Sequence, residues 1–312
     1  LPIFRTIRFD TEVTSTLIDR HVEALAPFAP ELIVGIGGGK AIDVAKAVAA
    51  RCGRRFIIVP TAASTDAPTS SLSVIYSESG AHEGEFFYDH SPSLLIVDSQ
   101  IIADGPVRLL VSGMGDALAT LIEADATRAA DVPNLVYHLD GGYRQTLAGQ
   151  AIARACYESL LHFGRLAKLS CENHVVTPAL DNIIETNILL SGLGFENNAT
   201  AGAHSINDGL TAVPNGDKTM HGEKVAFGTL VQLIAQNAPA QLLDEVTQFC
   251  LDVGLPVCLE ELHIDNSDET LRAVAAASMH SCWDNMPFDT DESTVFAALK
   301  IADRRGRALR RF

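Results

Sequence analysis

The stretch Leu32–Ala49, LIVGIGGGKAIDVAKAVA, joins an apolar run to three consecutive glycines and then to a helical pattern. The run LIVGI is typical of a buried strand. A helix that opens directly after the glycines presents free backbone N–H groups and its positive dipole end, which favours a phosphate. The dinucleotide pattern G-x-G-x-x-G is incomplete, because Lys40 stands at the third glycine and no acidic residue ends the next strand, Phe56–Val59. The residues alone leave two interpretations open: a phosphate site, or close packing of a helix on a strand.

The apolar pattern changes character along the chain. In the first part helical patterns alternate with strand-like runs. In chain order these are a helix near Thr11–Leu25, a strand at Leu32, a helix at Lys40, a strand at Phe56, and the runs LSVIY (residues 72–76) and SLLIVD (residues 93–98). This alternation predicts βαβ units with a parallel sheet. Later the apolar positions recur at helical spacing. We expect an α/β domain over residues 1–108 and an all-helical domain over residues 109–312, with a ligand cleft between them.

Composition excludes several classes of function. The 312 residues carry a net charge of −16, which repels a nucleic-acid backbone, and the basic C-terminal DRRGRALRRF is expected to be a solvated helix end. No apolar run reaches the roughly 18 residues of a membrane span, and the first residues lack the features of a secretion signal. The six cysteines are scattered, so we expect reduced, mostly buried thiols and a cytoplasmic location.

Three segments of the helical half place a metal-capable side chain beside glycine. They are SGMGDALAT with Asp116, AGAHSINDG with His204 and MHGEKVAFG with His221. One carboxylate and two imidazoles form a reasonable zinc set. Their separations match no short zinc motif, and most of the ten histidines in a chain of this size are expected to be surface or satisfied core residues, so the spacing alone is a weak indication of zinc.

Several long strings carry a resemblance to a known family. They are the glycine segment above, PTAASTDAPTSSLSVIY (residues 60–76), LLVSGMGDALAT (109–120), VTPALDNIIETNILLSGLGFE (176–196) and HGEKVAFGTL (221–230). With them the chain resembles the iron-containing, or group III, alcohol dehydrogenase superfamily, in its glycerol-oxidising branch. The likeness runs from about Ile33 to the C-terminus, and roughly the first 60 residues of the family pattern have no counterpart here.

The resemblance implies a Rossmann-like NAD-binding domain, a helical metal-binding domain and an active site in the cleft between them. It places the NAD pyrophosphate on Gly37, Gly38, Gly39 and Lys40. Further NAD contacts are implied for Thr61, Ser64, Ser70, Leu72 and Tyr76. The implied metal ligands are Asp116, His204 and His221, which also face the substrate, and Asp66 is implied to hold substrate hydroxyls. An Asx-type turn is the alternative role of Asp66.

The implied reaction is the NAD-dependent oxidation of glycerol, or of a similar small vicinal diol, to dihydroxyacetone. A hydroxyl beside the metal would lose its proton near neutral pH, and a hydride would pass to the nicotinamide. Either His221 or Asp66 could relay the proton. The resemblance also implies that the protein forms a homo-octamer and that its substrate is a small polyol.

The sequence departs from the family pattern at a few positions. Iron-type relatives carry a histidine four residues after the aspartate, where this chain has Thr120, so zinc is expected rather than iron. Two family glycines are replaced by Asn198 and Ala199, and a family histidine by Asn207. These changes are either drift or the mark of an altered polyol preference or weaker catalysis.

Two other functions remain as alternatives. A dehydroquinate synthase type of lyase would need several Lys and Arg residues around the metal site, and the segments around Asp116 and His204 offer none. The altered glycines leave room for a weakly active or non-catalytic protein on the same scaffold.

Overall fold

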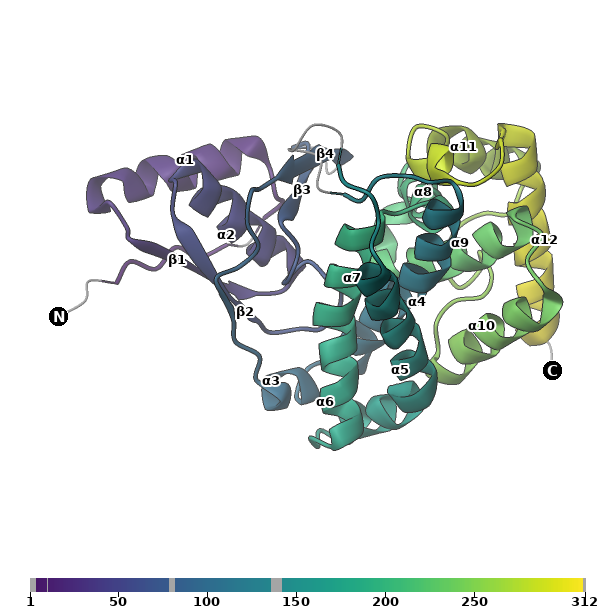
Figure 1. Cartoon of the computed structure of the whole chain (residues 1–312), viewed down its shortest axis with the longest axis horizontal. Coiled ribbons are helices and arrows are strands. Elements are labelled where there is room, and N and C mark those ends of the chain that lie inside the picture. Colours follow the sequence, from purple (N-terminus) through teal and green to yellow (C-terminus); the bar gives the residue numbers. More distant parts are fainter. Residues whose placement is uncertain (1–3, 10, 79–81, 136–141, 311–312) are drawn as a thin grey trace. The chain divides into compact units, whose positions relative to one another are not determined.

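The computed structural model describes residues 4–9, 11–78, 82–135 and 142–310. The chain forms two compact units (Figure 1). The first comprises the described residues up to Ala62 together with Ala67–Asp98, and the second comprises Ala63–Asp66 together with the chain from Ser99 onward. The first unit contains helices and a parallel sheet, and the second is helical, so the expected fold class is confirmed.

The first unit is built around a β–α–β segment. Its elements are α1 (Ser15–Leu25), a short 3-10 turn (Ala26–Phe28), β1 (Leu32–Gly37), α2 (Gly39–Arg51), β2 (Arg55–Pro60), β3 (Leu72–Tyr76), β4 (His82–Phe87) and β5 (Leu94–Leu95). Strands β1, β2 and β5 form a parallel sheet in that order, with Ile33 opposite Phe56. Helix α1 begins at Ser15 rather than Thr11 because the Thr14 hydroxyl accepts the Leu17 amide and caps it.

The run LSVIY departs from the expected parallel arrangement. As β3 it pairs antiparallel with β4 in a separate two-stranded sheet, with Ser73 opposite Phe86. The connection from Tyr76 to His82 is too short for the crossover of a dozen or more residues that a parallel pair requires.

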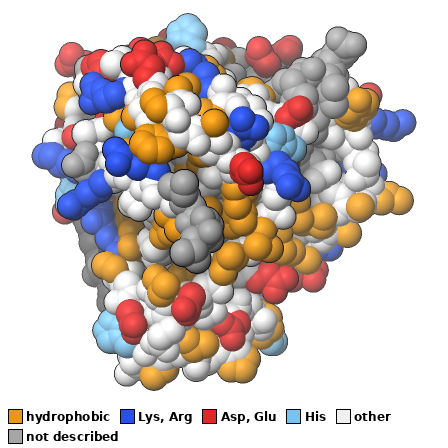
Figure 2. Space-filling model, turned by 90° about the vertical axis from the view of Figure 1, so that its left-hand side faces the viewer, with side chains coloured by type: hydrophobic (Ala, Val, Ile, Leu, Met, Phe, Trp, Pro, Cys, Tyr) orange, Lys and Arg blue, Asp and Glu red, His pale blue; other side chains and the backbone are white. Residues whose placement is uncertain are grey.

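Apolar side chains of α2 hold the first unit together. Val44 and Val48 pack with Leu17 and Ile18 of α1, in one cluster of buried residues. Ile42 and Ala49 of α2 pack against Phe56 and Ile58 of β2, in a second cluster. Hydrophobic side chains also gather at the surface seen in Figure 2, from the end where α1 and β1 lie, and the exposed ones of this unit include Leu32, Val34, Ile36, Leu94 and Ile96.

The second unit packs its helices around α4. Its elements are α3 (Ser99–Ala103), α4 (Val107–Ala129), α5 (Leu147–Glu172), α6 (Pro178–Glu185), a π-helical turn (Thr186–Leu190), α7 (Ser191–Asn198), α8 (Gly202–Thr211), a 3-10 turn (Gly216–Lys218), α9 (His221–Ala235), α10 (Ala240–Val253), α11 (Asp268–Ser278), a 3-10 turn (Cys282–Asn285) and α12 (Glu292–Arg310). Helices α5, α7 and α9 pack against α4, which is buried from Leu110 to Ala124. Helix α3 packs on α5 and α6, so the residues just before 108 contact the helical unit.

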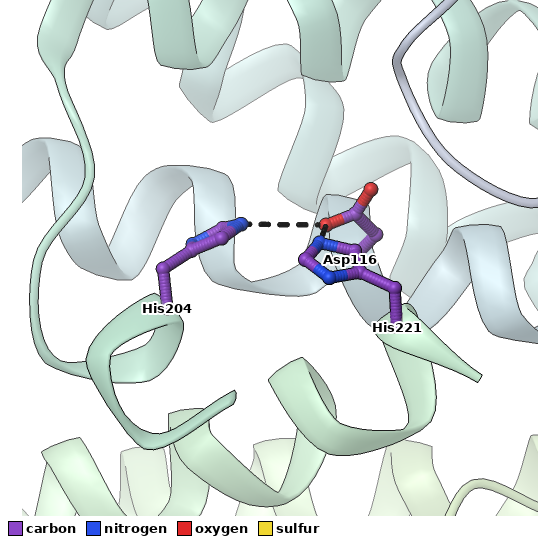
Figure 3. A group of neighbouring side chains, drawn as sticks. All are labelled: Asp116, His204 and His221. Atoms are coloured by element: carbon purple, nitrogen blue, oxygen red, sulfur yellow. Dashed lines mark ion pairs between the residues drawn. The ribbon is translucent and has the colours of Figure 1, made fainter. Parts of the chain in front are cut away.

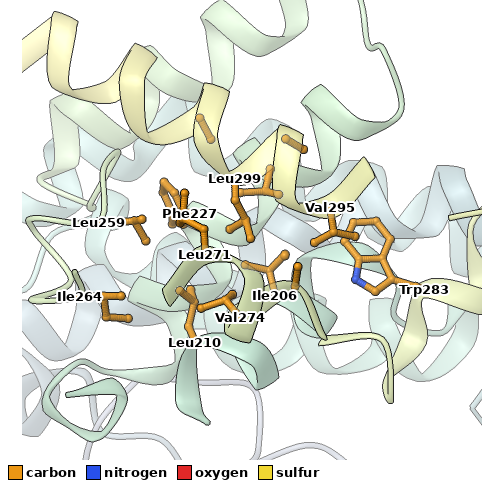
Figure 4. Close-up of a cluster of buried hydrophobic side chains, with 14 of the residues drawn as sticks. Ile206, Leu210, Phe227, Leu259, Ile264, Leu271, Val274, Trp283, Val295 and Leu299 are labelled. Carbon is orange, nitrogen blue, oxygen red and sulfur yellow. The ribbon is translucent and has the colours of Figure 1, made fainter. Parts of the chain in front are cut away.

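A large apolar core lies beside α8 and α9 (Figure 4). Ile206 and Leu210 of α8 and Phe227 of α9 meet residues of α11 and α12 there, and the buried Trp283 belongs to the same cluster. Apolar contacts in this core hold α8 and α9 in place, and both helices carry candidate ligands.

The cysteines behave as expected. All six are free thiols, and Cys156, Cys171, Cys250 and Cys258 are buried. Burial raises the pKa of Cys250 to about 12, so its thiol stays protonated and inert. Among the described helices, none combines the length and apolar character of a membrane span.

Candidate metal centre

The three candidate ligands converge from three helices. Asp116 lies in the middle of α4, His204 in the first turn of α8, and His221 is the first residue of α9. Figure 3 shows both imidazoles turned toward the carboxylate. His204 Nε2 lies 3.5 Å and His221 Nε2 3.2 Å from Asp116 Oδ1, and the three ligand atoms all lie within 4.8 Å of one another. Asp116 Oδ1 is buried and takes part in no hydrogen bond. One carboxylate oxygen and two imidazole nitrogens around one point fit a metal ion.

Glycines bring α4 and α9 into backbone contact at this point. A Cβ on Gly222 would lie 1.8 Å from the Ser112 carbonyl oxygen, and a Cβ on Gly115 would lie 2.3 Å from the Gly222 carbonyl oxygen. Only residues without a side chain permit this approach. The contact places His221, which precedes Gly222, beside Asp116, which follows Gly115.

His204 is held by a side chain that the sequence reasoning missed. Glu123, two helical turns after Asp116 on α4, lies with its Oε2 2.7 Å from His204 Nδ1. Its Oε1 accepts the backbone amides of Ala201 (2.9 Å) and His204 (3.0 Å). The spacing of seven residues after Asp116 was a usable signal, because positions i and i+7 share one helix face.

The charges at the centre favour a cation. Burial raises the pKa of Asp116, but His221 and His204 outweigh it and hold this pKa well below its usual range. Burial lowers the pKa of His204, but Glu123 and Asp116 reverse the effect and raise it well above the usual value. The buried carboxylates therefore stabilise positive charge at this point, and a metal ion supplies it when bound.

Asp66 lies beside the carboxylate of Asp116. Its backbone N–H points to Asp116 Oδ2 at 3.4 Å, and its own Oδ2 accepts a hydrogen bond from the Ser191 hydroxyl at 2.7 Å. Burial and the charge of Asp116 both raise the pKa of Asp66 well above its usual value. Thr120, at the position of the iron-type histidine, is buried and shares a hydrogen bond of 3.1 Å with Ser191.

A π-helical turn helps to place this group. Within it, the Asn187 amide donates to the carbonyl oxygens of Ala63 (2.9 Å) and Leu110 (3.0 Å). Ser191 follows directly and holds Asp66. The turn thus fastens the segment Ala63–Asp66 to the helical unit. Sequence periodicity gave no signal for it.

Comparisons with known proteins show which family this chain belongs to. Residues 3–99 match the model of the family of iron-containing alcohol dehydrogenases. A glycerol dehydrogenase of Thermotoga maritima is 46% identical over 295 residues, covering 93% of this chain and 80% of its own length. The chain belongs to the iron-containing alcohol dehydrogenase family. A glycolaldehyde reductase of Halobacterium salinarum is 40% identical, over 98% of this chain and 83% of that protein. The crystal structure of a probable glycerol dehydrogenase from Sinorhizobium meliloti matches with a TM-score of 0.92 and 38% identity, over 97% of this chain and 84% of that one.

The family's glycine segment forms an open turn between β1 and α2. Gly37 has a φ of +149°, in a region that favours glycine. A Cβ on Gly38, which precedes the first residue of α2, would meet nothing within 4 Å. Lys40 is exposed and forms an ion pair with Glu12, and the Thr61 amide donates to the Gly37 carbonyl oxygen at 2.9 Å. The open space at Gly38 therefore suits the approach of an anion to the helix start.

The remaining NAD residues of the family pattern lie in different surroundings. The Ser70 hydroxyl accepts from the ammonium group of Lys46 at 3.1 Å, and Leu72 and Tyr76 begin and end β3. Ser64 is buried in the helical unit, where its carbonyl oxygen accepts from Ser112. Contact of these residues with NAD, and an active site in a cleft between domains, stay predictions.

Lys46 is a second residue that the sequence reasoning missed. It is fully buried on α2, 3.1 Å from the Asp43 carboxylate, and donates to the carbonyl oxygens of Ala67 (2.8 Å) and Leu72. It therefore fastens the loop between Ala67 and Leu72 to the helix that the glycines open.

The two replaced glycines have distinct environments. Asn198 is buried, donates to the Gly194 carbonyl oxygen at 2.7 Å and accepts from Gln150 at 3.0 Å, so it joins α7 to α5. Ala199 ends α7 with φ 71° and ψ 171°. Asn207, one turn after His204, donates to Asp208 at 3.0 Å, and its own Oδ1 is buried without a partner.

Restoring glycine at position 199 should stabilise the protein. The backbone there lies in a region that only glycine adopts without strain, so Ala199→Gly should raise the free energy of unfolding by about 1 kcal/mol or more. Urea denaturation measures the change. The exposed mid-helix variant Ala155→Gly is the control and should lose about 1 kcal/mol. Equal losses in both variants would contradict strain at Ala199.

Proposed function

We propose that this protein oxidises glycerol, or a similar small vicinal diol, with NAD as hydride acceptor and one zinc ion per chain. The observation that carries the proposal is the convergence of Asp116, His204 and His221, whose ligand atoms lie within 4.8 Å of one another. Its support is the 46% identity to a glycerol dehydrogenase over 93% of the chain.

Each part of the site has a role in this proposal. Asp116, His204 and His221 hold the metal, which when bound supplies a Lewis acid that lowers the pKa of an alcohol hydroxyl. Asp66, held by Ser191, accepts a hydrogen bond from the neighbouring hydroxyl of the diol. The glycine turn binds the NAD pyrophosphate. When bound, NAD would supply the hydride acceptor for the carbinol carbon. The hydroxyl proton would pass through water to Asp66 or His221.

Zinc is proposed over iron because Thr120, where the iron-type pattern has a histidine, is engaged with Ser191. Three protein ligands with one open position are typical of catalytic zinc. NAD is proposed over NADP because the cofactor segments hold no Arg pair placed for a 2′-phosphate. A homo-oligomer and a cytoplasmic location complete the proposal.

Metal analysis combined with NADH formation tests this function. The purified protein should contain one zinc per chain and form NADH, but not NADPH, with glycerol. Bound zinc without NADH formation from any diol would favour a non-catalytic protein. Turnover of propane-1,2-diol or larger polyols but not glycerol would indicate an altered preference, to which the buried Asn207 could contribute.

Asp66→Asn should raise the KM for glycerol and lower kcat, with little effect on NAD affinity. The change removes a carboxylate that both Ser191 and a diol hydroxyl can approach, and the amide presents donors in its place. Steady-state kinetics and NAD titration measure the effects. Ser191→Ala is the companion variant, because it frees Asp66 without removing its charge, and it should show a smaller change of the same kind. A loss of NAD affinity alone would assign Asp66 to the cofactor.

A further inference from the structure

Glu123 is a buried acid without a role in the proposed reaction. Its side chain is 1% exposed in the middle of the helical unit. All of its hydrogen bonds described above go to residues 201–204: Oε1 takes two backbone amides and Oε2 takes the imidazole of His204. Burial of a carboxylate is unfavourable unless the charge is compensated, so such a fully engaged acid at one ligand calls for a specific explanation.

The contact to the ring decides which nitrogen of His204 carries the proton. A carboxylate only accepts hydrogen bonds, so the Nδ1 atom, 2.7 Å from Oε2, must be the donor. In the neutral ring this leaves the lone pair on Nε2, and Nε2 is the atom that lies 3.5 Å from Asp116 Oδ1. A metal ligand needs that lone pair.

Contacts to the backbone at the start of α8 fix the position of the His204 ring. Ala201 precedes α8 and supplies no side-chain cap. Glu123 of α4 accepts the amides of Ala201 and His204, while Gln232 of α9 accepts the amide of Ala203 at 2.8 Å. The start of α8 is therefore capped by α4 and α9, the helices that carry Asp116 and His221.

We propose that Glu123 is the positioning residue of the metal centre, fixing His204 in the Nδ1–H tautomer with its Nε2 lone pair directed at the metal. The proposal rests on the metal site of the proposed function. Glu123→Gln is the sharpest variant. In this variant the carbonyl oxygen of the introduced glutamine side chain accepts the two backbone amides, so its NH₂ group faces the His204 ring. Because NH₂ is a donor, it favours a lone pair on Nδ1, and the ring proton then moves to Nε2.

Zinc affinity, measured by competition with a chromophoric chelator on the metal-free protein, tests this proposal. Glu123→Gln should bind zinc about 10 to 100 times more weakly than the unchanged protein. Gln232→Leu is the matched control, because it removes a buried cap of the same helix start without touching the ring, and it should stay within about threefold. An equal loss in both variants, or none in Glu123→Gln, would overturn the proposal. Absence of zinc binding by the unchanged protein would instead defeat the proposed function.

Two further measurements isolate the ring. In a His204→Ala background, Glu123→Gln should have little additional effect on the remaining zinc affinity; the same loss in both backgrounds would show that Glu123 does not act through His204. Long-range ¹H–¹⁵N spectra of the zinc-loaded, ¹⁵N-histidine-labelled protein should show His204 as the Nδ1–H tautomer. The His204 signal is identified as the one that is absent from the spectrum of the His204→Ala variant. This measurement needs no folded Glu123 variant, and an Nε2–H signal from His204 would overturn the proposal.

Discussion

Replacing His221 with alanine should abolish stoichiometric metal binding and lower the rate of glycerol oxidation by at least about a thousandfold. His221 Nε2 is one of the three ligand atoms, and Lewis-acid assistance contributes several kcal/mol to reactions of this type. The side chain stands at the first position of α9, where alanine is tolerated by the backbone, so the fold should persist. Metal analysis and NADH formation measure the two effects.

His162→Ala is the control for this prediction. His162 lies on α5 of the same unit, exposed and in edge contact with Phe163, outside the metal-capable group. This variant should keep the metal content and the rate. Full zinc occupancy together with full activity in His221→Ala would remove His221 from the ligand set.

Lys46→Met should lower the free energy of unfolding by about 3 to 5 kcal/mol. Lys46 is fully buried, and its ammonium group neutralises Asp43 and satisfies the carbonyl oxygens of Ala67 and Leu72. Methionine fills the space but leaves the buried carboxyl group without its partner, which is far more destabilising than the loss of an exposed pair. Since Lys46 ties the Ala67–Leu72 loop to the helix after the glycine turn, NAD affinity should fall too.

The matched control is Lys40→Met, on the same helix. The Lys40 side chain is 56% exposed and pairs with Glu12, so solvent screens the interaction and the change should stay within about 1 kcal/mol. Urea denaturation followed by circular dichroism compares the two variants. Equal stability of Lys46→Met and Lys40→Met would mean that the buried pair contributes nothing to folding.

Much of the architecture could be predicted from the sequence because its causes are local. The glycines between an apolar run and a helical pattern predict the β1–α2 turn, and the apolar periodicity from residue 109 predicts the helical unit. The antiparallel pairing of LSVIY was not predicted, since a strand's partner is decided by the length of the connection and by packing, not by its own alternation. The π-helical turn at Asn187 likewise depends on the carbonyl oxygens that it meets.

The sequence by itself determined the family, the residue types of the metal set and the glycine segment, because long strings and local backbone preferences are written in the order of residues. Only the tertiary structure decided that Asp116, His204 and His221, which lie on three helices, meet within 4.8 Å. It also decided that Glu123 holds His204 and that Lys46 is buried against Asp43. The physical reason is that a hydrogen bond or an ion pair depends on distance in space. The backbone contact at Gly222, which places His221 beside Asp116, joins residues far apart in the chain.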